Sequence, residues 1–147
     1  IKILRELWQK EVSTYKGAYF SFKDAYSYPK PARQVPILIG GESDAALRRV
    51  AELGDGWLPY NLTPEDAGPA IRKLKTMARA AGRDPEKFRI CKIVYSVATM
   101  DDLKRYRDAG VTEFNMASNG EIPLDAPGLE AKFREFQDKI VGPVGAL

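Results

Sequence analysis

From residue 35 onward, the chain alternates short apolar runs with amphipathic helical patterns, and this alternation restricts the folds open to it. Each apolar run is followed by one helical pattern. The run 35–39 precedes the helical pattern 43–53, 56–60 precedes 63–82, 88–98 precedes 99–109, and 111–117 precedes 127–141. Strands that alternate with helices through short connections pair in parallel, with right-handed crossovers. The sequence therefore predicts four consecutive strand–helix units.

Two architectures accommodate such units: an open, doubly wound sheet and a closed (β/α)8 barrel. A whole barrel takes about 250 residues, whereas this chain has 147. Four units in this length equal half of a barrel, so we expect an α/β fold that corresponds to half of a TIM barrel. All 147 residues are assigned to one domain, in which residues 35–147 supply the four units. The outer strands of a half-barrel have free edges, which need a partner.

Residues 1–34 do not follow this pattern. Apolar residues recur with helical spacing over residues 1–12, but no capping residue precedes them, so we interpret this segment as the end of a helix in a truncated chain. Residues 13–34 contain two closely spaced prolines and are predicted to form a long, mostly irregular excursion, with a short hairpin as an alternative. The aromatic residues between Tyr15 and Tyr28 are expected to anchor the excursion on the barrel, and a pocket lid is the alternative.

The strongest candidate site is the junction between the first strand and its helix, Gly40-Gly41-Glu42-Ser43. Two glycines at the carboxyl end of a strand let backbone N–H groups approach a ligand closely. Ser43 begins a helix whose unpaired N–H groups and dipole favour an anion. The segment is therefore a candidate phosphate site, and a tight turn followed by a helix cap is the alternative. Glu42 suits such a site only if its carboxylate points away from the phosphate.

Polar residues also fall near the carboxyl ends of the other strands, where barrel enzymes collect their site residues. Tyr60, followed by Asn61, is the candidate for a ligand contact at the second strand, while Ser96 and Asn115 are weaker candidates at the third and fourth.

Three residues are expected to be structural. Gly56 removes a clash, Trp57 packs between helices, and Cys91 is a buried thiol within a strand rather than a nucleophile.

The composition limits the function classes further. The 23 basic and 20 acidic residues leave a net charge of +3, which is too small and too scattered for a nucleic-acid groove. No apolar stretch approaches the roughly 18 residues that cross a membrane, and no secretory signal opens the sequence. A single cysteine fits a reducing compartment, so we expect a cytoplasmic protein. The absence of histidine removes the commonest general base and the commonest metal ligand, and no metal site is expected.

Several segments, in this order, resemble the luciferase-like monooxygenase superfamily, especially its coenzyme F-420-dependent branch. These segments are Tyr15 to Phe20, Pro29 to Pro31, Pro36 to Gly41, Ala46 to Trp57 and Ala81 to Pro85. The resemblance covers residues 13–84 well and the rest in pattern only. It implies a TIM (β/α)8 barrel of the bacterial-luciferase-like type, with this chain as the C-terminal half that supplies the last four strands.

The resemblance also implies a cofactor, either coenzyme F-420 (a deazaflavin) or FMN, whose phosphate binds at Gly40, Gly41, Glu42 and Ser43. Tyr60 lies near a second cofactor contact, and Glu42 is placed to reach a ribityl hydroxyl. The implied reaction is hydride transfer or monooxygenation of a small organic substrate. In this family the residues that activate the substrate lie in the first half of the barrel. No catalytic residue is therefore assigned, and we expect the chain alone to be inactive.

The predicted partners are a small-molecule substrate, the missing N-terminal half-barrel and a second copy in a homodimer, with no nucleic acid and no membrane. One alternative is a self-associating half-barrel that acts as a binding module without catalysis. Another is a phosphate-binding TIM-barrel enzyme of a different class, such as an isomerase or aldolase. That class often requires a lysine or glutamate at a strand end, and the sequence places no lysine convincingly there.

Overall fold

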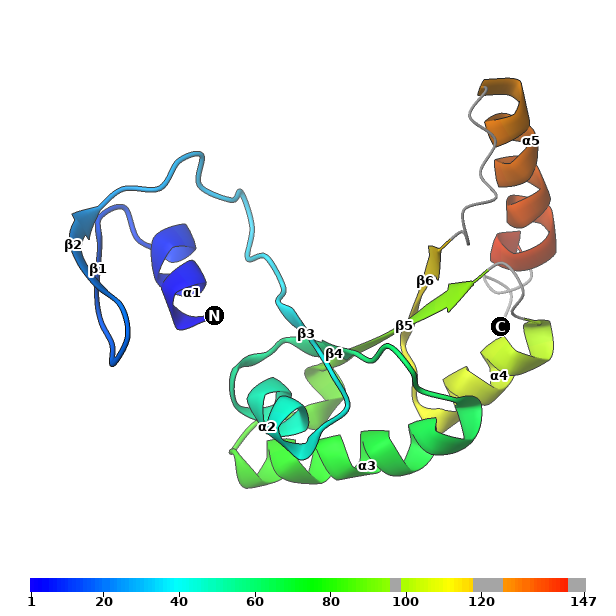
Figure 1. Ribbon diagram of the computed structural model, residues 1–147, viewed down its shortest axis with the longest axis horizontal. Helices are drawn as coiled ribbons and strands as arrows, with labels where there is room; N and C mark the ends of the chain where they lie inside the picture. The colour runs from blue at the N-terminus through cyan, green and yellow to red at the C-terminus, as the bar shows by residue number, and fades with distance from the viewer. Residues whose placement is uncertain (96–98, 118–125, 143–147) are drawn as a thin grey trace.

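The computed structural model describes residues 1–95, 99–117 and 126–142, and its central feature is a parallel sheet of four strands (Figure 1). The strands are β3 (Leu38–Gly40), β4 (Gly56–Leu58), β5 (Arg89–Tyr95) and β6 (Glu113–Ala117). They lie in the sheet in chain order, and the helices that join them are α2 (Asp44–Leu53), α3 (Pro64–Ala80) and α4 (Met100–Ala109). All three helices cover the same face of the sheet, whereas a doubly wound sheet carries helices on both faces. The arrangement is that of half a barrel.

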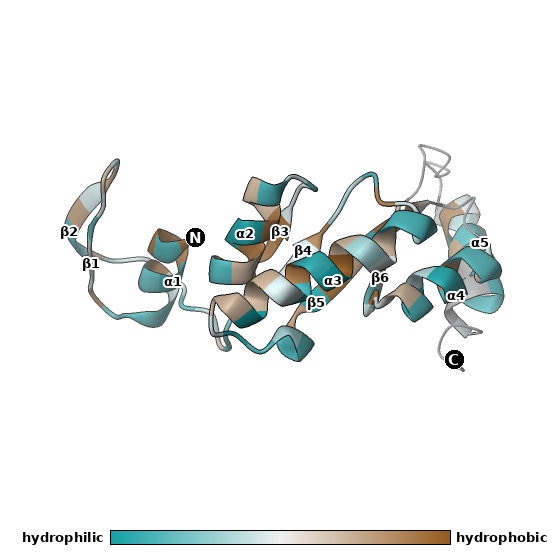
Figure 2. Cartoon of the chain, turned by 90° about the horizontal axis from the view of Figure 1, so that it is seen from below, coloured by the Kyte–Doolittle hydropathy of each residue, from teal (hydrophilic) through white to brown (hydrophobic). Residues whose placement is uncertain are grey.

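The core lies between the sheet and these helices. Ile39, Trp57 and Ile90 are neighbours in register on β3, β4 and β5, and each is at most 7% exposed. Val50 of α2 and Leu74 of α3 are fully buried in the same cluster. Much of the hydrophobic colour in Figure 2 lies on the strands behind the helices. Full burial of each such side chain contributes about 2 kcal/mol, so this layer fixes the helices on the sheet.

The helices begin where the sequence predicts them to begin, because helix caps are local contacts. Ser43, Thr63 and Thr99 each accept a hydrogen bond from the backbone N–H three residues further on. The Asp102 carboxylate accepts in turn from the Thr99 backbone N–H, which completes a capping box. Gly110 ends α4 in the left-handed region, with φ of 108°. The predicted starts of these helices and the stop at Gly110 are confirmed.

The strands are shorter than predicted, most clearly at the first one. The apolar run 35–39 predicts a strand buried on both faces, but β3 has three residues, and Val35 is 38% exposed. Ile39 is the buried residue of this strand. The prediction is wrong here because β3 lies at the edge of the sheet and the described helices cover one face. The third strand was predicted to end at residue 98, and residues 96–98 lie outside the described part of the chain.

Residues 1–34 contain the predicted helix, α1 (Lys2–Gln9), and a two-stranded antiparallel hairpin, β1 (Ser13–Lys16) and β2 (Ser21–Ala25). The Arg5 guanidinium ties α1 to the turn between α2 and β4 by donating to the Leu53 carbonyl and the Asp55 carboxylate, each at 2.9 Å. Asp55 also accepts from the Ile37 N–H just before β3, so its carboxylate fixes the turn to the start of the sheet. This turn precedes β4, so α1 and the hairpin lie beyond the amino ends of the strands (Figure 1).

The aromatic residues of the hairpin were expected to anchor it on the barrel or to form a lid, and the structure supports neither expectation. Tyr15 and Phe22 stack on each other at 6.0 Å. Tyr19 and Phe20, near the hairpin tip, are 93% and 70% exposed. The hairpin also lies at the amino ends of the strands, whereas the glycine loop follows the carboxyl end of β3.

The last described helix, α5 (Ala126–Phe136), continues into a π-helical turn, Gln137–Val141. The predicted helix over 127–141 is therefore confirmed, with a change of winding in its last turn. Within residues 1–95, 99–117 and 126–142, no helix has the length and apolar character needed to cross a membrane.

Candidate functional site

The glycine loop that follows β3 adopts a conformation that requires glycine at one position. Gly41 has φ of +97°, in the left-handed region that side chains disfavour. A Cβ atom at Gly41 would lie 3.1 Å from the Cβ atom of Ala46, so the loop folds tightly onto the start of α2. A Cβ atom at Gly40 would approach the Leu58 carbonyl at 3.5 Å, which is an ordinary contact. Gly41, rather than Gly40, therefore sets the shape of the loop.

The buried indole of Trp57 forms a hydrogen bond with the backbone of this loop. Its Nε1–H donates to the Gly41 carbonyl oxygen at 2.7 Å, and the side chain is fully buried. The sequence predicted the packing of Trp57, which is confirmed, but gave no sign of this hydrogen bond. With the Gly41 carbonyl turned toward Trp57, one polar group of the loop is fixed in direction.

The start of α2 offers hydrogen-bond donors next to the loop. The Ser43 hydroxyl oxygen accepts from the Ala46 N–H at 3.2 Å, which leaves the hydroxyl proton available to donate. The N–H groups of Asp44 and Ala45 lie in the first turn, where no intrahelical acceptor exists. The Lys73 ammonium, 2.5 Å from the Asp44 carboxylate, lowers the pKa of Asp44 by a hydrogen bond and by its charge. This carboxylate is thereby engaged with α3.

Glu42 connects the glycine loop to the loop after β4. Its carboxylate accepts from the N–H of Tyr60 at 2.5 Å and from the N–H of Asn61 at 3.2 Å. The predicted site residues at the ends of β3 and β4 are thus brought together, through the backbone of Tyr60 and Asn61. The Glu42 carboxylate points toward the β4–α3 loop, which meets the condition that the sequence set for a phosphate beside it. The Tyr60 side chain is 62% exposed at this edge of the sheet.

Lys92 is a residue that the sequence analysis missed. It lies in β5, is 7% exposed, and donates from Nζ to the Tyr60 carbonyl at 2.8 Å. Burial lowers the pKa of Lys92, and the charge of Glu42 opposes that shift. A lysine within the apolar run 88–98 was the available signal, since a charged residue in a buried strand calls for an explanation.

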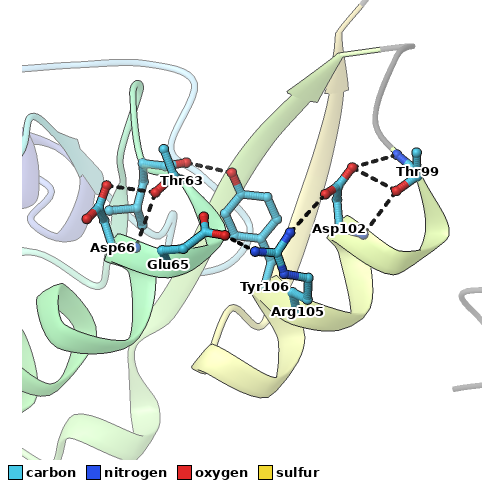
Figure 3. A network of polar contacts seen from close by, with 8 residues as sticks. Thr63, Glu65, Asp66, Thr99, Asp102, Arg105 and Tyr106 are labelled. Atoms are coloured by element: carbon cyan, nitrogen blue, oxygen red, sulfur yellow. Dashed lines mark hydrogen bonds and ion pairs between the residues drawn. The ribbon is translucent and has the colours of Figure 1, made fainter.

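A network of polar contacts joins the β4–α3 loop to α4 (Figure 3). The Tyr106 hydroxyl donates to the Leu62 carbonyl at 2.6 Å, and Arg105 forms ion pairs with Glu65 and Asp102. These contacts hold the start of α3 against the middle of α4. The β4–α3 loop, which carries Tyr60, is therefore bound to α4 as well as to Glu42.

The other residues singled out by the sequence have structural surroundings or weaker claims. A Cβ atom at Gly56 would lie 2.1 Å from the Arg89 carbonyl oxygen, so the predicted clash is confirmed. Cys91 is buried, and burial raises the pKa of its thiol, which fits the predicted inert role. Asn115 is exposed on β6, and Ser96 lies outside the described residues.

The fold and this edge of the sheet define half of a (β/α)8 barrel with a glycine-containing loop at the carboxyl end of its first strand. Residues 1–139 match the sequence profile of luciferase-like monooxygenases. The chain belongs to the luciferase-like monooxygenase family, as the resemblance predicted.

Relatives are longer than this chain. An uncharacterised protein from Mycobacterium tuberculosis is 34% identical over 139 residues, which make up 93% of this chain and 48% of that protein. A pyrimidine monooxygenase from Allorhizobium ampelinum is 26% identical over 161 residues, across 100% of this chain and 43% of its own length. The chain therefore spans about half the length of the curated relatives it matches.

A solved structure confirms the fold. An F-420-dependent secondary alcohol dehydrogenase, in complex with an F-420–acetone adduct, aligns with a TM-score of 0.72 at 18% identity. The alignment covers 95% of this chain and 58% of that one. The predicted α/β fold, as part of a luciferase-like TIM barrel, is thereby confirmed.

Proposed function

We propose that the complete protein is a coenzyme F-420- or FMN-dependent oxidoreductase or monooxygenase that acts on a small organic substrate. Within it, the chain described here supplies the site for the phosphate of the cofactor. The observation that carries the proposal is the loop Gly40–Ser43, in which Gly41 has φ of +97° and Trp57 fixes its carbonyl beside the start of α2. Family membership and the F-420-dependent neighbour in fold support this choice of cofactors.

The residues present fit a phosphate. The donors are the first-turn N–H groups of α2 and the Ser43 hydroxyl, and the helix dipole adds a partial positive charge. The two carboxylates nearest in sequence are both engaged elsewhere, Glu42 with the Tyr60 and Asn61 N–H groups and Asp44 with Lys73. The missing side chain at Gly41 leaves room for the tight approach of the loop to α2.

When bound, the cofactor supplies the redox chemistry, and the protein binds it, orients its ring and excludes water. The chain contributes the phosphate site and the Tyr60–Asn61 segment beside it. No group that exchanges a proton with the substrate is assigned to this chain. The chain alone is accordingly expected to be inactive, with the substrate-activating residues elsewhere in the complete protein.

A fluorescence titration of the complete gene product with F-420, and separately with FMN, tests the proposal. Tight binding of F-420 alone identifies a deazaflavin-dependent dehydrogenase or reductase, and binding of FMN alone identifies a monooxygenase. Binding of neither cofactor by the folded protein would defeat the proposed function and leave the fold intact.

Gly41→Asp is the variant that addresses the loop directly. It places a carboxylate in the loop and a side chain in the left-handed region, so we expect the affinity for the cofactor to fall by at least about a hundredfold. Gly82→Asp is the matched control, because Gly82 also has positive φ (+72°) but has open space around it at the far end of α3. Unchanged affinity in Gly41→Asp would remove the glycine loop from the site.

One observation favours the alternative of a self-associating half-barrel. Leu58 on β4 and Ile93 on β5 point away from the helix-covered face and are only partly buried. Light scattering coupled to size-exclusion chromatography distinguishes the two functions. A symmetric dimer of the 147-residue chain at micromolar concentration would support a self-associating module, whereas monomer or soluble aggregate would eliminate it. Membership of the luciferase-like family argues against a phosphate-binding barrel of a different class.

A further inference from the structure

Lys92 is an unusual residue for its position. It points to the same face of β5 as the core residue Ile90, and its Nζ lies 5.8 Å from the centre of the Tyr106 ring. In the part of the chain that the structure describes, no carboxylate lies within ion-pair distance of Nζ, whose partner is the Tyr60 carbonyl. Burial of an ammonium group without an ion-pair partner is unfavourable, because the group loses its hydration without gaining an opposite charge. A buried lysine of this kind calls for a functional reason.

Two hydrogen bonds connect Lys92 to Glu42 of the glycine loop, through the backbone of Tyr60. Lys92 holds the C=O of Tyr60, and Glu42 holds the N–H of the same residue. The backbone of one residue therefore separates a buried positive charge from a negative charge in the loop. Glu42 itself belongs to the proposed phosphate site and directly precedes Ser43, whose hydroxyl is one of the proposed donors. A phosphate bound there adds a second negative charge close to Glu42, and like charges at short range repel each other.

We propose that Lys92 is the counter-charge that allows the Glu42 carboxylate and a phosphate-bearing cofactor to occupy the same edge of the sheet. This inference rests on the proposed function. Lys92 acts through the Tyr60 peptide and through its field, and is therefore a positioning residue. It selects cofactors that carry a phosphate over the same ring systems without one. The Lys73–Asp44 pair performs the equivalent neutralisation on the other side of the loop, at the start of α2.

The test compares the affinities of the complete gene product for FMN and riboflavin, which differ by the phosphate alone. If the protein binds F-420 instead, the pair is the deazaflavin 5′-monophosphate and the phosphate-free deazaflavin, which again differ by the phosphate alone. Lys92→Gln removes the charge and retains an N–H donor on a side chain one atom shorter. We expect it to weaken binding of the phosphorylated cofactor about tenfold and to change binding of the phosphate-free ligand less than twofold. Lys92→Arg restores the charge and is expected to recover most of the lost affinity. Lys104→Met, on the exposed side of α4, is the control for loss of a positive charge elsewhere.

A second variant separates electrostatics from loop packing. If Lys92 offsets the charge of Glu42, the double variant Lys92→Gln with Glu42→Gln recovers affinity for the phosphorylated cofactor relative to Lys92→Gln alone. If the two residues merely hold Tyr60 in place, the double variant binds more weakly still, and the inference is overturned. Equal losses for the phosphorylated and phosphate-free ligands, or no loss for either, also overturn it. Failure of the unmodified protein to bind any of these ligands defeats the proposed function itself, which is distinguishable because it needs no variant.

Discussion

Replacing Trp57 by phenylalanine tests whether the indole N–H fixes the glycine loop. Trp57 is fully buried, and its Nε1–H donates to the Gly41 carbonyl oxygen at 2.7 Å. A phenyl ring fills part of the same space but lacks the N–H group and several ring atoms. Loss of the hydrogen bond costs about 1 kcal/mol, and the smaller ring leaves a cavity that costs about 2 kcal/mol. We expect the free energy of unfolding to fall by about 3 kcal/mol.

Two measurements on the complete gene product check this reasoning. Urea denaturation, monitored by circular dichroism, gives the loss of stability. Fluorescence titration with F-420 or FMN, whichever the unmodified protein binds, gives the cofactor affinity at a temperature where both proteins are folded. We expect Trp57→Phe to bind about tenfold more weakly, because the Gly41 carbonyl is no longer fixed. Phe88→Leu, which alters the core at the amino end of β5, is expected to lose stability with unchanged affinity. A Trp57→Phe protein with the cofactor affinity of the unmodified protein would refute the role assigned to this bond.

Two further predictions concern the sheet. Gly56→Ala places a Cβ atom 2.1 Å from the Arg89 carbonyl oxygen and 2.5 Å from the Leu38 side chain, so we expect a loss of more than about 3 kcal/mol in urea denaturation. Gly82→Ala is the comparison: its Cβ atom meets open space, so only the strain of the left-handed backbone is expected, about 1–2 kcal/mol. The two hydrogen bonds from Arg89 lower the pKa of Glu113, so this pair contributes stability above the ordinary glutamate value of 4.5, and that contribution is lost as the pH falls through the lowered pKa. Because both side chains are partly exposed to solvent, which screens the pair, the contribution is small. Glu113→Gln should flatten the dependence of stability on pH in this acidic range, and an unchanged profile would contradict the assignment.

The sequence by itself determined the features that depend on contacts between residues close together in the chain. Ser43, Thr63 and Thr99 cap their helices with bonds to residues three positions away, and Gly110 ends a helix through its own backbone conformation. The order of strands and helices follows from the apolar periodicity, and with it the parallel sheet. The family was also recognisable from short segments in the correct order. These features require no knowledge of distant contacts.

The tertiary structure decided what depends on residues far apart in the sequence. The Gly41 carbonyl meets the Trp57 indole, the Glu42 carboxylate meets the Tyr60 N–H, and Lys92 reaches the Tyr60 carbonyl only because β3, β4 and β5 lie side by side. Local pattern could not predict these contacts, since the same residue types in an open sheet would face other neighbours. The placement of all three crossover helices on one face has the same origin. It follows from packing across the whole sheet, where burial of the shared core outweighs the preference of any single segment.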